Sequence, residues 1–155
     1  MSRNLYAQFT GVPMDSDDVD RLLESQGYGI ISLCADGEPY SIPVSFGYDG
    51  EYVYVPFLIN EPDATKTRFI SDGATARLLV TDVRDRFDWQ SVSVTGTARS
   101  IDPGGDEWDR FLETLVDNGW FMRGFERADS VDSIQGWRIE IDELQGLERQ
   151  EQPVE

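Results

Sequence analysis

The chain has 155 residues, with 30 acidic and 13 basic side chains and no histidine, and its formal net charge is −17. This length is sufficient for one domain with its own hydrophobic core. The negative charge repels phosphate backbones and argues against nucleic-acid binding. Without histidine, Ser-His-Asp and Cys-His catalysis, His-ligated haem and nearly all zinc sites are excluded, and we expect no metal site. Difficult chemistry would therefore need a cofactor.

The acidic residues are dispersed, and Lys66 is the only lysine among the 13 basic residues. This composition resembles that of cytosolic proteins from salt-accumulating halophiles, in which salt screens the self-repulsion. No apolar run approaches the roughly 20 residues of a membrane helix, and residues 1–5 lack the apolar stretch of a secretory signal. We therefore expect a cytoplasmic protein without membrane contact. The single cysteine, Cys34, excludes an intrachain disulfide and is expected to be a small buried hydrophobe.

The first half of the chain predicts one helix followed by three strands. A helix is expected within residues 14–27, because Asp15 and Ser16 are candidate N-caps and the apolar residues share one face. Strands are expected at residues 28–35, 40–48 and 51–57, separated by Asp-Gly turns. These strands should form an antiparallel meander.

The second half predicts a short helix at residues 66–73 and a clearly amphipathic helix at residues 104–119. Further strands are expected at residues 74–83, 90–101 and 135–142. Residues 120–133 read as irregular. Many short strands connected by hairpins indicate a mainly β fold, an antiparallel, Greek-key-like β-barrel with flanking helices. We expect a single domain over residues 1–147 and a disordered acidic tail at residues 148–155.

Pro43 falls within the predicted second strand, and Pro39 directly precedes it. Proline cannot donate to a β-ladder, so it marks an edge, a bulge or a departure from the sheet. One interpretation is an edge strand protected against aggregation. The other is a strand whose outer backbone is kept for a ligand, with Ser41 and Ser45 facing away from the apolar stripe. The pattern alone leaves both open.

Lys66 lies in "TKTR" at the start of a predicted helix, where free N–H groups and the helix dipole favour an anion. The alternative is a solvated surface charge. Further along, "WQSVSVTGTA" opens a strand with an indole, an amide and a hydroxyl.

Four segments in order carry a resemblance to a known family: "GYGIISLCADGEPYSIPVSFGYDGEYVYV", "ATKTRFI", "ARLLV" and "WQSVSVTGTARSID". Their order and spacing resemble the pyridoxamine 5′-phosphate oxidase-like flavin-binding family. Within it, the chain is most similar to the small single-domain branch that includes 5-nitroimidazole-resistance nitroreductases. The resemblance spans about residues 15–102, and the final strand "QGWRIEI" also fits.

The resemblance implies a split β-barrel that binds FMN at a homodimer interface. It implies backbone contacts to the isoalloxazine ring, a basic residue at the phosphate and a polar side chain near the ring. The implied cofactor-binding residues are Ile42, Pro43, Val44 and Ser45, then Val55, Pro56 and Phe57, then Lys66 and Thr67, and finally Trp89 and Ser91, which flank Gln90.

Departures from the family pattern narrow the expected activity. Nitroreductase-like relatives often carry a histidine near the position of Pro56, and Thr65 replaces a second basic residue of the oxidase, which leaves Arg68 as a helper. The oxidase's basic residues for a phosphorylated substrate have no match. We therefore expect an FMN-dependent oxidoreductase of undefined substrate, with hydride transfer through flavin N5 and a small molecule or nicotinamide nucleotide as partner. The alternative is a non-catalytic flavin- or deazaflavin-binding module, a sensor or carrier.

Overall fold

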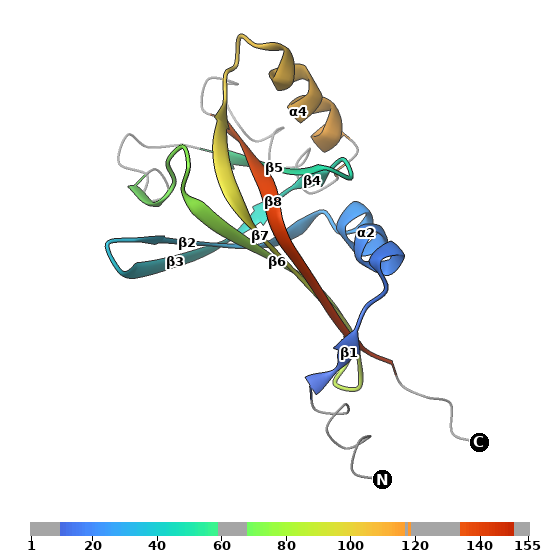
Figure 1. Cartoon of the computed structure of the whole chain (residues 1–155). Helices are drawn as coiled ribbons and strands as arrows, with labels where there is room; N and C mark the ends of the chain where they lie inside the picture. The colour runs from blue at the N-terminus through green and yellow to red at the C-terminus, as the bar shows by residue number, and fades with distance from the viewer. Residues whose placement is uncertain (1–9, 59–67, 117, 119–133, 151–155) are drawn as a thin grey trace, which may run out of the picture.

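A computed structural model describes residues 10–58, 68–116, 118 and 134–150 (Figure 1). Its labelled helices and strands are β1 (Val12–Pro13), α2 (Ser16–Ser25), β2 (Tyr28–Ala35), β3 (Glu38–Ser45), β4 (Gly47–Tyr48), β5 (Tyr52–Leu58), β6 (Thr75–Asp85), β7 (Asp88–Ile101), α4 (Asp106–Val116) and β8 (Ile134–Arg149). Among the described residues, no helix is long and apolar enough to cross a membrane.

The strands form one antiparallel sheet in the order β3-β2-β6-β7-β8-β5-β4, and β1 pairs with β8. The two ends of this order, β3 and β4, are consecutive in the sequence, and only Phe46 separates them. A sheet whose two ends are joined by one residue must curl back on itself. The predicted β-barrel with flanking helices is therefore confirmed.

In the described part of the chain, buried side chains form two separate clusters. The larger cluster fills the barrel and receives α2, whose Val19, Leu22 and Leu23 are buried as the helical pattern predicts. The smaller cluster lies between α4 and the barrel, where the Phe111 ring meets the Tyr54 ring edge-on at a centroid distance of 6.3 Å. Figure 1 shows α2 beside β4 and α4 above β4 and β5, so the helices cover neighbouring parts of the barrel.

The predicted meander is wrong in one respect. The expected strand at residues 40–48 breaks at Phe46, so that β3 pairs with β2 and β4 pairs with β5. The break leaves the alternation of inward-facing residues intact, because Phe46 is itself buried in the larger core. For this reason the sequence pattern gives no sign of it.

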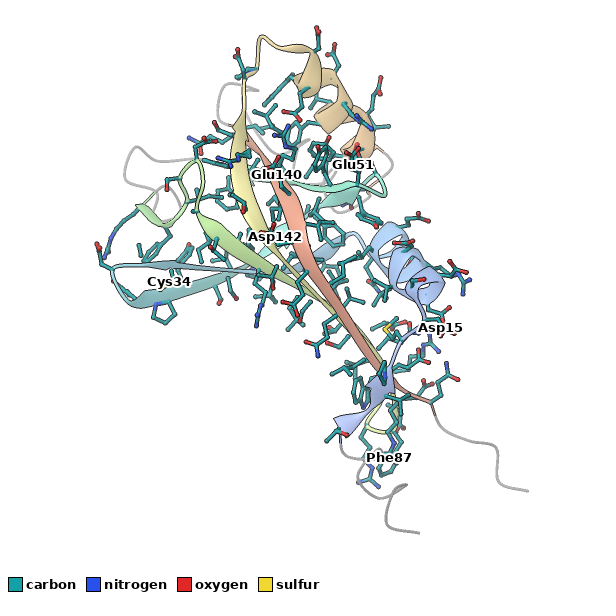
Figure 2. All side chains as sticks on the ribbon, viewed as in Figure 1. Asp15, Cys34, Glu51, Phe87, Glu140 and Asp142 are labelled. Carbon is teal, nitrogen blue, oxygen red and sulfur yellow. The ribbon has the colours of Figure 1, made fainter. Side chains whose placement is uncertain are left out.

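Three other expectations need correction. β8 extends past the predicted boundary at residue 147, because Glu148 pairs with both Gln90 and Val12, and the remaining tail residues 151–155 lie outside the described residues. The short helix expected to end at Gly73 ends at Phe69, and residues 66–67 of it also lie outside. Cys34 is exposed, because it belongs to the outward-facing alternate residues of β2. Figure 2 shows it near the tip of the β2–β3 hairpin.

Gly96 lies at a register shift in the pairing of β7 with β8. A Cβ atom there would lie 2.1 Å from the Glu140 carbonyl oxygen and 2.8 Å from Ile139 Cγ2. We predict that Gly96→Ala lowers the free energy of unfolding by about 1–3 kcal/mol, because β7 or β8 must move. Gly104→Ala is the matched control, since its nearest neighbour would be 3.7 Å away. Equal urea unfolding midpoints of the two variants would contradict this packing.

The excess of 17 negative charges predicts a salt-dependent stability. At low ionic strength the acidic groups repel one another, whereas at 1 M salt the screening length shrinks to about 3 Å. We expect the melting temperature to rise steadily from low salt into molar KCl, with NaCl acting alike because the effect is screening. A melting temperature that does not change over this range would show that self-repulsion has no influence on stability.

Candidate functional site

Among the described strands, none lies beyond the prolines of β3, so they occupy an edge of the sheet. β3 pairs with β2 along its whole length and ends the strand order. The connecting residues Asp36 and Gly37 have φ angles of 52° and 79°, as in the two-residue turns typical of hairpins. Such a turn makes the flanking Ala35 and Glu38 a hydrogen-bonded pair, and bonded and non-bonded pairs then alternate along the strand.

This alternation directs the backbone groups of residues 39, 41, 43 and 45 away from β2. Pro39 and Pro43 both occupy such positions, so the missing N–H costs no hydrogen bond to β2. The edge position, which both interpretations of the prolines require, is confirmed.

The second open edge belongs to β5. β4 pairs with β5 through only two pairs, Gly47 with Tyr54 and Tyr48 with Val53. β3 directly precedes β4 in the chain. If the pairing of β4 with β5 continued in the same register through Phe46, β3 would lie alongside the second half of β5. The sheet contains no such pairing between β3 and β5.

Proline explains why this ladder stops. In the extended register, Ser45 would face Pro56 and Pro43 would face Leu58, and both would be hydrogen-bonded pairs. Each pair would lack one N–H donor, because a proline stands on one side of it. The two strands therefore part at Phe46. We call the unpaired edges of residues 39–45 and 55–58 the split.

The split offers backbone groups to a ligand. On β3, Ser41 and Ser45 have N–H donors that face outward, and residues 39–45 provide outward carbonyl oxygens at every second position. Among the described residues, these groups have no backbone partner. A planar heterocycle with hydrogen-bond donors and acceptors along one side fits such an edge, because it can replace the missing strand.

Four of the predicted ring-contact residues, Ile42, Val44, Val55 and Phe57, have side chains that face the barrel interior. The alternation along β3 and β5 turns Pro43, Ser45 and Pro56 to the opposite side. Val44, Val55 and Phe57 belong to the larger core, Pro56 is buried, and Ile42 is half-buried against the core. A ligand in the split would therefore meet the backbone of the four inward-facing residues, as the resemblance implies, with the core packed behind it.

Lys66 and Thr67 lie outside the described residues, but the end of their predicted helix is described. The Phe69 ring stacks on the Tyr40 ring of β3 at 4.7 Å, and the guanidinium of Arg68 lies 5.0 Å above the Phe69 ring. Arg68 Nη2 also pairs with Glu38 Oε2 at 2.8 Å, with both side chains more than half exposed. Arg68 and Phe69, which follow Thr67 in the sequence, thus contact β3.

Trp89 and Ser91 are not brought to the split within one chain. β7 is separated from β3 by β2 and β6, and from β5 by β8. The Trp89 indole packs against the backbone of Gly11, where a Cβ atom would lie 2.7 Å from the indole Cη2. Gln90 donates to Glu148 at 3.1 Å.

The sheet also carries exposed apolar side chains on the face turned away from the barrel interior. Ile30 of β2 lies between Pro43 and Leu79 in register, and Ile30 and Leu79 are 36% and 38% exposed. Tyr28 and Val83, on the same two strands, are 45% and 68% exposed. We call these side chains of β3, β2 and β6 the outer face. It begins at Pro43, on the split itself.

Among the described residues, three tyrosines have raised pKa values. The neighbouring Glu51 carboxylate raises the pKa of Tyr52. Burial raises the pKa of Tyr48, whose hydroxyl donates to Asp20 of α2 at 2.7 Å. Burial and the nearby Asp49 carboxylate raise the pKa of Tyr54 to about 12. All three phenols are neutral at pH 7. In the described part of the chain, no group of three or more His, Cys, Asp or Glu side chains could hold a metal ion.

Known structures share this fold. A FAD-binding protein from Mesorhizobium loti superposes with a TM-score of 0.73 at 17% identity, covering 88% of this chain and 96% of that one. The FAD and heme binding protein from Mycobacterium smegmatis gives 0.66 at 22% identity, covering 91% and 74%. The flavocytochrome Anf3 from Azotobacter vinelandii gives 0.62 at 18% identity, covering 91% and 70%.

No curated protein matches the sequence. The family model described as pyridoxamine 5′-phosphate oxidase matches residues 15–148, which include every described strand from β2 to β7 and nearly all of β8. The chain therefore belongs to the pyridoxamine 5′-phosphate oxidase family, a family of flavin-binding proteins.

Proposed function

We propose that this protein binds FMN in the split and is an FMN-dependent oxidoreductase. The observation that carries the proposal is the pair of unpaired strand edges, each interrupted by proline where a ladder would need an N–H. A bound flavin would supply a hydride acceptor or donor at N5. The chain would contribute hydrogen bonds from Ser41 and Ser45 and exclusion of water by the core behind β3 and β5.

The phosphate of FMN would be held by Lys66 and Thr67. Lys66 is two residues before Arg68, which lies beside β3 and is paired with Glu38. Because Arg68 already has an acidic partner, Lys66 is the better candidate for the phosphate. We assign no catalytic side chain, because hydride transfer itself requires no acid or base from the protein.

We further propose that the site is completed by a second copy of the chain. Trp89 and Ser91 lie too far from the split in their own chain, so they would reach the flavin only from another subunit. The outer face borders the split and exposes Ile30, Leu79 and Val83. Contiguous exposed apolar side chains usually mark an interface, and a twofold dimer is the commonest assembly.

Two other functions are compatible with the same split. The first is a sensor or carrier that binds flavin or deazaflavin without turnover. The second is heme binding, because one solved structure of similar fold is a FAD and heme binding protein. The sequence contains no histidine, so histidine ligation of a heme iron is unavailable, and flavin is favoured.

For the proposed oxidoreductase, we expect a cytoplasmic protein with a small molecule or a nicotinamide nucleotide as the redox partner.

FMN titration at high salt tests the proposal, and Lys66→Ala tests the phosphate assignment. The wild type should bind about one FMN per subunit. Loss of a charge-assisted contact, on the order of 1.5–3 kcal/mol, should weaken FMN binding roughly ten- to a hundredfold. Riboflavin, which lacks the phosphate, should bind both proteins equally. Arg21→Ala on α2 is the control and should bind FMN like the wild type.

A colourless protein that does not quench FMN fluorescence would contradict the proposed function. Equal FMN dissociation constants for wild type and Lys66→Ala would contradict the phosphate assignment alone. If FMN is bound, its bleaching by NADH or NADPH without oxygen distinguishes an oxidoreductase from a carrier. No reduction by either nucleotide would favour the carrier.

The oligomeric state is tested by Leu79→Glu on the outer face. A charge at this position should convert a wild-type dimer into a monomer in light scattering and weaken FMN binding, because Trp89 and Ser91 of the second copy are lost. Val116→Glu is the matched control, since Val116 is an apolar side chain of α4 that is 58% exposed and lies outside the outer face. A monomeric wild type at micromolar concentration would contradict the dimer.

A further inference from the structure

One residue closes the barrel. Phe46 lies between Ser45, the last residue of β3, and Gly47, the first residue of β4, and these strands end the sheet on opposite sides. Its side chain is 2% exposed and belongs to the larger core. The direction in which the open edge of β3 leaves the barrel is therefore set at Phe46.

Both backbone groups of Phe46 are hydrogen-bonded. Its N–H donates to the Gly27 carbonyl at 3.2 Å. Its carbonyl accepts a hydrogen bond from Asn118 Nδ2 at 2.8 Å, and the same nitrogen donates to the Gly27 carbonyl at 2.7 Å. An asparagine amide has two hydrogens, one for each carbonyl. Asn118 thus joins the end of β3 to the residue before β2.

Asn118 is in turn held by α4. Its N–H donates to the Leu115 carbonyl at 3.0 Å, and Leu115 is fully buried in the smaller core. Thr114 packs directly on Gly47, because a Cβ atom on Gly47 would lie 2.5 Å from Thr114 Cγ2. In Figure 1, α4 lies over β4 and β5. The helix therefore fixes the point from which the amide reaches Phe46.

We propose that Asn118 is a positioning residue for the split: its amide fixes Phe46 and, through it, the outward-facing backbone of Ser45. The proposal rests on the proposed function, because the positioned edge is the one that would contact the flavin. The chemistry is specific to a donor amide. Aspartate has the same shape but would set a carboxylate against two carbonyl oxygens, and leucine would leave both carbonyls without this donor.

The test compares Asn118→Asp with Met14→Ala. Met14 is buried and packs near Gly146, away from the connection between β3 and β4. Its truncation therefore lowers stability without removing a contact of Phe46. In the cofactor-free protein, Asn118→Asp should speed hydrogen exchange of the Phe46 and Gly47 amides by at least about tenfold relative to Met14→Ala. FMN should bind at least about tenfold more weakly, and the visible circular dichroism of any bound flavin should change.

Asn118→Ser keeps one hydroxyl donor and should lie between the wild type and Asn118→Asp, which provides a second variant if the aspartate protein does not fold. Wild-type exchange at Phe46 together with wild-type FMN affinity in a folded Asn118 variant would overturn the proposal. So would an equal loss of FMN affinity in Met14→Ala, since the effect would then reflect stability alone. A wild type that binds no FMN would contradict the proposed function, while exchange at Phe46 would still decide the role of Asn118.

Discussion

A β-ladder requires N–H donors at alternate residues on both strands, and this barrel lacks two of these donors at the split. Pro43 on β3 and Pro56 on β5 stand at the positions where continued pairing would need an N–H. The rest of the barrel is continuous, from β2 through β6, β7 and β8 to β5. The split is therefore a local feature that proline maintains. The barrel around it is closed and packed, so the open edge does not make the fold loose.

Recognition through the backbone has consequences for an acidic chain. Amide and carbonyl groups carry no net charge, so a flavin ring can be held without placing ionised side chains in the split. The phosphate of the proposed FMN, in contrast, would have to approach a chain with a net charge of −17. Arg68 beside β3 is already paired with Glu38. High salt would weaken the repulsion and the attraction to Lys66 together, so hydrogen bonds that salt does not screen become more important.

Local patterns were sufficient to predict the barrel and much of its core. The Asp36-Gly37 turn and the alternation of Tyr40, Ile42 and Val44 fix the hairpin, and the structure agrees with both. The prolines correctly indicated an edge. The division of one predicted strand into β3 and β4 could not be predicted, because Phe46 continues the inward alternation without interruption.

The hydrogen bonds by which Asn118 holds the end of β3 could not be predicted from local sequence patterns either. Asn118 contacts Gly27 and Phe46, which precede it by 91 and 72 positions in the sequence. An asparagine after a helix normally indicates only a helix end. Nor can a sequence place residues of one chain in the site of another. Trp89 and Ser91 match the family pattern by position, yet β2 and β6 separate them from β3. The proposed second copy would reconcile the pattern with the topology.

The most direct test of this account is an experimental structure of the protein with FMN bound at high salt. The account predicts β3 and β5 unpaired beyond Phe46, with the isoalloxazine ring hydrogen-bonded to the outward backbone groups of residues 41–45. It also predicts Trp89 and Ser91 of a second copy at the same ring. A continuous ladder between β3 and β5, or a flavin bound away from this edge, would contradict it.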